Sequence, residues 1–316
     1  MTSHDSAVWS QTIDTLIPRI HEVDRNATRI WFRFYPLALA DAFARTDNPE
    51  KLAHALRLDG QYRLVDQCDT SHWFFHGHRF WPHVKAAVIK QATSHGQPSA
   101  SPDLDLLATI LAVAQDAAAA AHTEESLVRG IAAVGVMTLQ QIGLAAFAHA
   151  PGTAEGPSGL ARKSPDQILA ARRKDERQGL MGLIRGAANA QYRVTFDERR
   201  PDAGFSVISH TPLTNGSARD TRPYPSTPRR CHEGPIPVEC RTASCGTCWI
   251  GVLAGAEKLS DVEEQEAKLL KDCGYFTKTE AKPVIRLACK AVASGNVTIV
   301  IPTWNGFLSK GGLRGL

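Results

Sequence analysis

The sequence predicts an α+β protein in which a helical region, residues 1–150, precedes a region of short strands, residues 190–316. The first region has apolar residues at helical spacing, with start and stop signals between the segments. Residues 151–158 are rich in Pro and Gly, which indicates a linker. Beyond residue 190, short runs of β-branched and aromatic residues predict strands.

The helical region is expected to form a bundle. Residues 8–45 have helix-period apolar positions, which Pro18 and Pro36 should interrupt. Further helices are expected over residues 50–58, 82–92, 101–121 and 123–151. The last two are rich in Ala and adjacent, so we expect an antiparallel pair. Residues 151–189 should then link the two regions and contain a basic helix that faces either solvent or an acidic partner.

The second region is expected to contain four strands and one helix. The strands are predicted over residues 192–196, 205–209, 249–253 and 297–301. The helix should run from Ser260 to about Cys273, with Ser260 and Glu263 forming a capping box. The Pro-rich residues 211–237 are expected to form a long loop.

Charge and hydropathy exclude some functional classes. The chain carries 36 Lys and Arg against 32 Asp and Glu, and basic residues do not crowd together with aromatics, so we expect no nucleic-acid partner. The longest apolar stretch, residues 131–148, contains Gln140 and Gln141 and barely reaches the length of a membrane span, so we expect a buried helix. The polar N-terminus has no targeting pattern, which favours the cytoplasm.

Four of the seven cysteines form a metal-binding pattern. An odd number of cysteines without a signal peptide favours reduced thiols over disulfides. Cys240-x4-Cys245-x2-Cys248, followed by 40 residues and then Cys289, has the spacing of plant-type [2Fe–2S] ligands. Small residues such as Gly246 would let the loop backbone approach the cluster. The alternatives are a zinc site, which usually takes its ligands from two C-x2-C pairs, and four buried thiols.

These motifs resemble those of the [2Fe–2S] ferredoxin family over about 110 residues. The matching segments are Pro237-Val238-Glu239-Cys240-Arg241, Ser244-Cys245-Gly246-Thr247-Cys248, Arg286-Leu287-Ala288-Cys289-Lys290 and the closing residues 295–302. The resemblance implies a β-grasp fold and a [2Fe–2S] cluster held by the four cysteines, which transfers single electrons without a substrate. Two features depart from the family. The Pro-rich stretch stands where the family has a helix, so this helix should be shortened or replaced. The net charge of +4 over residues 190–316 favours a fixed partner over a diffusing shuttle.

An acidic segment follows the cysteine loop. Residues 259–266 resemble the helix with which vertebrate-type members of the family dock their redox partners. The resemblance implies docking through the acidic residues Asp261, Glu263, Glu264 and Glu266. The alternative is a solvated helix whose acidic first turn suits the helix dipole.

A second cluster of metal-binding residue types lies in the helical region. His72 and His76 are four residues apart, which on a helix would place both imidazoles on one face and suit a metal or haem. The alternatives are an aromatic-rich packing segment or a protein contact, because Trp73, Phe74 and Phe75 lie between them.

The leading functional hypothesis is an electron-transfer protein with no catalytic activity of its own. It would act as a dedicated subunit or adaptor of a larger oxidoreductase, for example a hydrogenase or a dehydrogenase. One alternative is a flavin reductase fused to a ferredoxin domain, since Arg222-Pro223-Tyr224-Pro225 is similar to a flavin-contacting motif. Another alternative is a redox sensor in which the cluster controls a helical binding domain.

Overall fold

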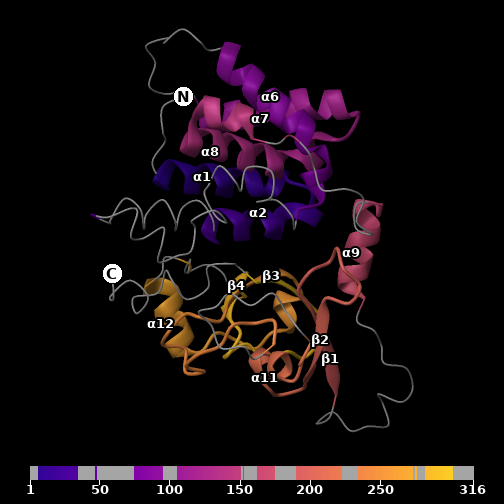
Figure 1. Ribbon diagram of the computed structural model, residues 1–316, viewed down its shortest axis with the longest axis vertical. Helices are drawn as coiled ribbons and strands as arrows, with labels where there is room; N and C mark the ends of the chain where they lie inside the picture. Colours follow the sequence, from indigo (N-terminus) through magenta and orange to yellow (C-terminus); the bar gives the residue numbers. More distant parts are fainter. Residues whose placement is uncertain are drawn as a thin grey trace. The chain divides into compact units, whose positions relative to one another are not determined.

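The computed structural model describes residues 6–34, 47, 75–94, 105–150, 152, 162–174, 190–222, 234–272, 275 and 282–301 (Figure 1). The chain divides into two compact units, Met1–Pro165 and Asp166–Leu316. Each unit has its own buried apolar core. The mixed α/β architecture is confirmed, with helices in the first unit and a five-stranded mixed sheet in the second. The helix expected over residues 50–58 lies outside the described residues.

The first unit is helical throughout its described residues. Its elements are α1 (Ser6–Leu16), η1 (Ile17–Arg19), α2 (Glu22–Phe34), η2 (His76–Phe80), α6 (Trp81–Ser94), α7 (Leu106–Ala121) and α8 (Glu125–His149). The expected break at Pro18 is confirmed, because this residue lies in the 3₁₀ turn between α1 and α2. Helix α7 ends at His122, which has a φ of 49°, and α8 begins three residues later and packs against it.

Helix α8 is the longest helix among the described residues and is largely apolar. In that part of the chain it alone is long and apolar enough to cross a membrane, and 56% of its most apolar window is buried. It packs against α2, α6 and α7, and Trp9 of α1 donates a hydrogen bond to the Gln140 side chain at 3.0 Å. A kink at Gly143, with a φ of 80°, interrupts the helix near its end. The expectation of a buried helix rather than a membrane span stays a prediction.

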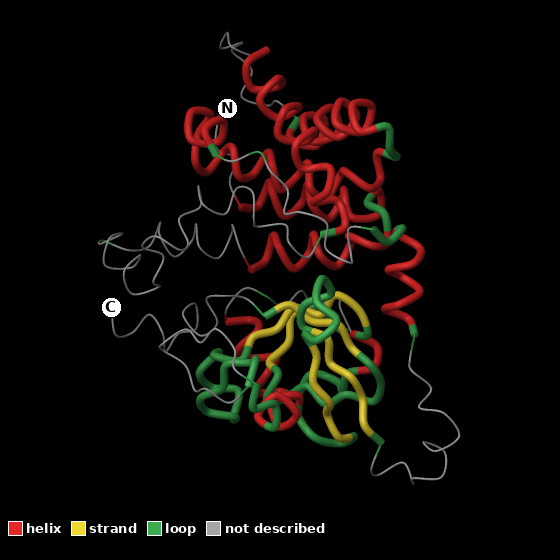
Figure 2. Tube along the Cα trace, turned by 45° about the vertical axis from the view of Figure 1, so that its right-hand side comes forward, coloured by secondary structure: helices red, strands yellow, loops and turns green. Residues whose placement is uncertain are grey.

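The second unit is built around a mixed sheet (Figure 2). Its strands are β1 (Gln191–Thr195), β2 (Gly204–Ile208), β3 (Trp249–Ala254), β4 (Ile285–Leu287) and β5 (Val297–Val300). They lie in the order β2-β1-β5-β3-β4. The β1–β5 pair is parallel, and the other neighbouring pairs are antiparallel. The three buried residues of β4 were not expected to form a strand, because three residues are too few to establish an alternating pattern.

Short helices cover the outer strands of this sheet. Helix α11 (Leu213–Ala218) packs on β2, α12 (Glu264–Asp272) packs on β4, and η4 (Ala256–Lys258) follows β3. Helix α9 (Pro165–Arg173) precedes the sheet, and its Arg172 forms a two-point ion pair with Glu198 at 2.7 and 2.8 Å. This basic helix therefore meets an acidic group within its own unit.

Two expectations for this region were wrong. The Pro-rich stretch contains the six-residue helix α11, which packing of its buried Leu213 and Thr214 stabilises, since a helix this short is marginal alone. Helix α12 begins at Glu264 rather than Ser260, so the capping box does not form. The Ser260 hydroxyl instead accepts a hydrogen bond from the backbone N–H of Val292 at 3.2 Å.

Gly216 lets α11 approach β2 closely. A Cβ atom at this position would lie 2.7 Å from the Ser206 carbonyl oxygen and 2.9 Å from the Val207 Cβ. Gly216→Ala should therefore destabilise the α11–β2 contact by about 1–3 kcal/mol through overpacking. Hydrogen exchange of peptides from residues 190–222 under denaturant would measure this. Arg219→Ala, at the exposed end of the same helix, should leave exchange unchanged; equal exchange in both variants would contradict the close packing.

Candidate metal centre

Pairing between β3 and β4 brings the two cysteine segments together. Trp249 pairs with Leu287 in the antiparallel register, and the N–H of Ala288 donates to the Cys248 carbonyl oxygen at 2.9 Å. Cys248 directly precedes this register, and Cys289 lies two residues after it. Because the strands are antiparallel, the two cysteine segments become neighbours although 40 residues separate Cys248 from Cys289 in the sequence.

The loop that carries the first three cysteines has an unusual backbone. Arg241 and Ala243 have φ values of 55° and 60°, and Gly246 has a φ of 70°. Left-handed conformations are uncommon for residues other than Gly and store strain, which tends to occur at functional sites. The backbone N–H groups of Thr242 and Thr247 point at the sulfurs of Cys240 and Cys245, each at 3.4 Å.

Cys240 and Cys245 form one half-buried pair of thiols. Burial by itself would raise the pKa of Cys240, but hydrogen bonds from Ser244 and Thr242 outweigh it. Together with the hydrogen bond from Cys245, they lower this pKa to about 6. The pKa of Cys245 is raised, first by burial and then by its hydrogen bond with Cys240. The two thiols therefore differ, because the surroundings favour the thiolate form more at Cys240 than at Cys245.

Cys248 and Cys289 form a second pair, with exposed fractions of only 3% and 4%. Their mutual hydrogen bond raises the pKa of Cys248 well above its usual value. The same bond lowers the pKa of Cys289. Charge–charge effects also connect the pairs, between Cys245 and Cys248 and between Cys240 and Cys289.

The donor set fits a two-iron cluster. A [2Fe–2S] centre is held by four cysteine thiolates, two on each iron, and the four thiols lie in one region as two pairs. Across the described ranges, no group of three or more His, Cys, Asp or Glu side chains is placed to hold a metal ion.

The acidic residues expected to dock a partner differ in their surroundings. Asp261 is 2.6 Å from the Lys282 ammonium group, which holds the pKa of that carboxyl below its usual value. Glu263 forms an ion pair with Lys290 at 3.0 Å, and Glu264 is exposed. Lysines therefore neutralise two of the four acids.

Glu266 does not belong to a docking surface, so this expectation was wrong. Its side chain is 0% exposed and forms a two-point ion pair with Arg286, at 2.8 and 2.9 Å. It also accepts a hydrogen bond from the backbone N–H of Leu287 at 2.7 Å. Arg286 donates further to the backbone carbonyls of Ser260 and Asp261. The pair thus fixes the segment that leads to Cys289.

Helical spacing could have revealed this role. Glu266 lies three and four residues before the buried Leu269 and Leu270, so all three occupy one face of α12. A lone carboxylate on an apolar helix face needs a buried cation. Arg286, three residues before a predicted ligand, was the candidate that the sequence interpretation missed.

Two histidines of the first unit, His76 and His78, have structural contacts. Asp24, which is 1% exposed, accepts hydrogen bonds from the backbone N–H groups of His76 and Gly77 at 2.6 and 2.9 Å. The His76 ring is buried beside Phe80, with ring centroids 6.4 Å apart. The His78 Nδ1 atom lies 2.6 Å from the Phe75 carbonyl oxygen. His72 lies outside the described residues, so a site shared by His72 and His76 stays a prediction.

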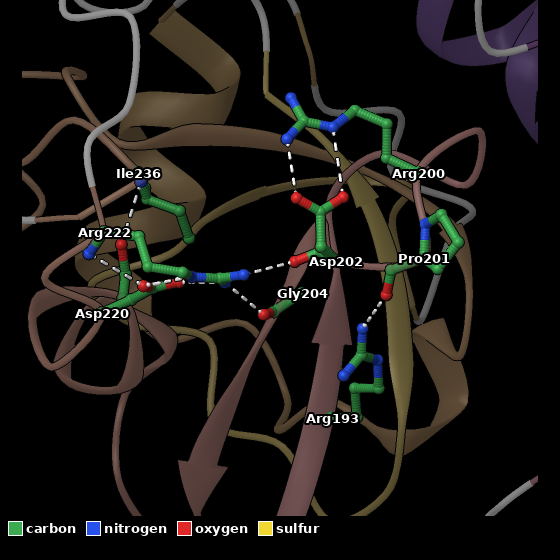
Figure 3. Close-up of polar contacts among 9 residues, drawn as sticks. Arg193, Arg200, Pro201, Asp202, Gly204, Asp220, Arg222 and Ile236 are labelled. Atoms are coloured by element: carbon green, nitrogen blue, oxygen red, sulfur yellow. Dashed lines mark hydrogen bonds and ion pairs between the residues drawn. The ribbon is translucent and has the colours of Figure 1, made fainter.

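Arg222, from the motif similar to a flavin contact, forms hydrogen bonds at the end of the β1–β2 hairpin (Figure 3). Its guanidinium group binds both carboxylate oxygens of Asp220, at 2.8 and 2.5 Å. It also donates to the carbonyl oxygens of Asp202 and Gly204, at 2.6 and 2.7 Å. These contacts occupy all three guanidinium nitrogens in closing the hairpin. No described feature presents this arginine to a flavin.

No family model, curated protein or solved structure matches the chain. The resemblance to [2Fe–2S] ferredoxins therefore comes from the sequence motifs and not from any matched protein.

Proposed function

We propose that the chain is a one-electron carrier whose second unit is a β-grasp domain with a [2Fe–2S] cluster. Cys240 and Cys245 would hold one iron, and Cys248 and Cys289 the other. The cluster, when bound, accepts and releases single electrons. The observation that carries this proposal is that the β3–β4 register brings Cys289 beside Cys248. Cys248 ends a loop whose backbone N–H groups point at the sulfurs of Cys240 and Cys245.

The topology of the sheet supports the β-grasp assignment. A mixed sheet with one parallel pair at its centre and a helix packed on it is what the ferredoxin resemblance implies. Here β1 and β5 form the parallel pair, and α12 packs on β4. This arrangement would bring the four ligands together, because the loop before β3 and the segment after β4 both adjoin the β3–β4 edge of the sheet.

The two thiol pairs would have different tasks. Cys248 and Cys289 are buried, so they would anchor the cluster in the protein and exclude water from its inner side. Cys240 and Cys245 are half-buried, so their side would face the donor or acceptor. Backbone N–H groups directed at both of these sulfurs would stabilise negative charge there.

A fixed partner in a larger oxidoreductase complex agrees best with the charges of this unit. Residues 190–316 carry 17 basic and 13 acidic residues, unlike a strongly acidic shuttle. The lysine partners of Asp261 and Glu263 further reduce the negative charge beside α12. The contact with the partner would therefore depend less on salt than a contact between strongly charged surfaces.

A redox titration tests this function. Anaerobically purified full-length protein should bleach reversibly in the visible range with a one-electron Nernst slope and one electron per chain. NADH, NADPH and added flavin should produce no turnover. A two-electron slope, or bound flavin that accounts for the absorbance, would instead favour the flavin reductase alternative.

A further inference from the structure

A hydrogen bond closes the loop that carries the first three cysteines. The hydroxyl group of Thr247 donates to the Glu239 carboxylate at 2.9 Å. Glu239 directly precedes Cys240, and Thr247 directly precedes Cys248. The contact therefore joins the residue before the first ligand to the residue before the third.

Thr247 is held on two sides. Its side chain is buried, with an exposed fraction of 5%, and its hydroxyl group is bound by Glu239. Its backbone N–H points at the Cys245 sulfur at 3.4 Å. A rotation of this residue would therefore both break the hydroxyl contact and turn the N–H away from the sulfur.

The segment that carries Glu239 is itself anchored. Val238 is 2% exposed, and the backbone N–H of Ile236 donates to the Ser217 hydroxyl of α11 at 2.9 Å. The loop between these anchors and β3 contains the left-handed Arg241 and Ala243. A backbone in such conformations persists only where surrounding contacts hold it, and the Glu239–Thr247 bond spans its two ends.

We infer that Glu239 and Thr247 are positioning residues that hold the cysteine loop in the form able to retain the cluster, and that the Glu239 charge lowers the cluster's reduction potential. This inference rests on the proposed function. Removing a group that orients the ligands of a metal, without binding the metal itself, typically changes the metal affinity 10- to 100-fold. Reduction adds a negative charge, which a nearby carboxylate disfavours.

Four single substitutions separate the hydrogen bond from the charge. Thr247→Val removes the hydroxyl group at nearly constant volume, whereas Thr247→Ser keeps it. Glu239→Gln keeps an acceptor oxygen without the charge, whereas Glu239→Ala removes both. Glu264→Gln is the matched control, because it removes an exposed acidic charge from the same unit without contacting the loop.

The readouts are loss of visible absorbance under an iron chelator and the midpoint potential. Thr247→Val and Glu239→Ala should lose the cluster about tenfold faster than the wild type, and Thr247→Ser should restore the wild-type rate. Glu239→Gln should retain the cluster but have a more positive potential than Glu264→Gln.

The outcomes distinguish this inference from the proposed function. A wild-type protein without iron overturns both. A wild-type protein with a cluster, but with equal chelation rates for Thr247→Val and Thr247→Ser, overturns the positioning role alone. Equal potentials for Glu239→Gln and Glu264→Gln overturn the effect of the charge. Circular dichroism of each variant identifies any that fail to fold. If Thr247→Val fails to fold, the chelation rate of Thr247→Ser, which keeps the hydroxyl group, decides the positioning role.

Discussion

Cys248→Ala is expected to abolish the [2Fe–2S] cluster while leaving the helical unit folded. Cys248 is buried, hydrogen-bonded to Cys289 and directly connected to β3. Removing its sulfur leaves one iron with a single protein ligand, and no other described cysteine lies on that side. Iron, acid-labile sulfide and visible absorbance should fall to the level of the colourless apoprotein.

The matched control is Cys68→Ser. Cys68 has no spacing that relates it to the four-cysteine pattern, so its replacement should leave iron and sulfide unchanged. Far-ultraviolet circular dichroism should remain dominated by the helices of the first unit in both variants. A Cys248→Ala protein with a full complement of iron and sulfide would show that the proposed ligand set is incorrect.

Glu266→Ala should destabilise the sheet unit by about 3–5 kcal/mol, because it leaves the Arg286 charge buried without its partner. Both side chains are essentially inaccessible, at 0% and 1% exposure. The Leu287 N–H would also lose its acceptor. Hydrogen exchange of peptides from β3, β4 and β5 under denaturant measures this effect locally, since a chain of two units need not unfold in one step.

Two further variants test whether the unpaired Arg286 charge causes the loss of stability in Glu266→Ala. Glu264→Ala, on the exposed side of the same helix, should change stability by less than about 0.5 kcal/mol. The double variant Glu266→Met with Arg286→Met should be more stable than Glu266→Ala, because it buries no unpaired charge. Its remaining cost should be about 1–3 kcal/mol from the unpaired Leu287 N–H. A double variant less stable than Glu266→Ala would contradict the ion-pair explanation.

Local signals in the sequence predicted much of the fold. Pro18 marks the break between α1 and α2, because proline removes a helical hydrogen bond. Four of the five strands contain enough β-branched and aromatic residues to be recognised. The start of α7 was placed too early, because Asp105, and not an earlier residue, caps it through the Leu107 N–H at 3.0 Å.

The elements that the sequence did not predict depend on contacts between residues distant in the sequence. Strand β4 has three residues and exists because it pairs with β3, so no local pattern marks it. Helix α11 is stabilised by packing on β2 through Gly216. Glu266 belonged to an acidic run in the sequence, and only its pairing with Arg286 shows it to be a core residue. The cysteine spacing predicts its site by chemistry alone, because such a cluster requires a compact loop and one distant ligand, and this site stays a prediction.

Metal and sulfide analysis of anaerobically purified wild-type protein, combined with electron paramagnetic resonance after reduction, tests the central claim most directly. The account predicts about two irons and two acid-labile sulfides per chain, with a rhombic low-temperature signal from one unpaired electron. One zinc per chain without sulfide, or a metal-free protein with four titratable thiols at these cysteines, would contradict it.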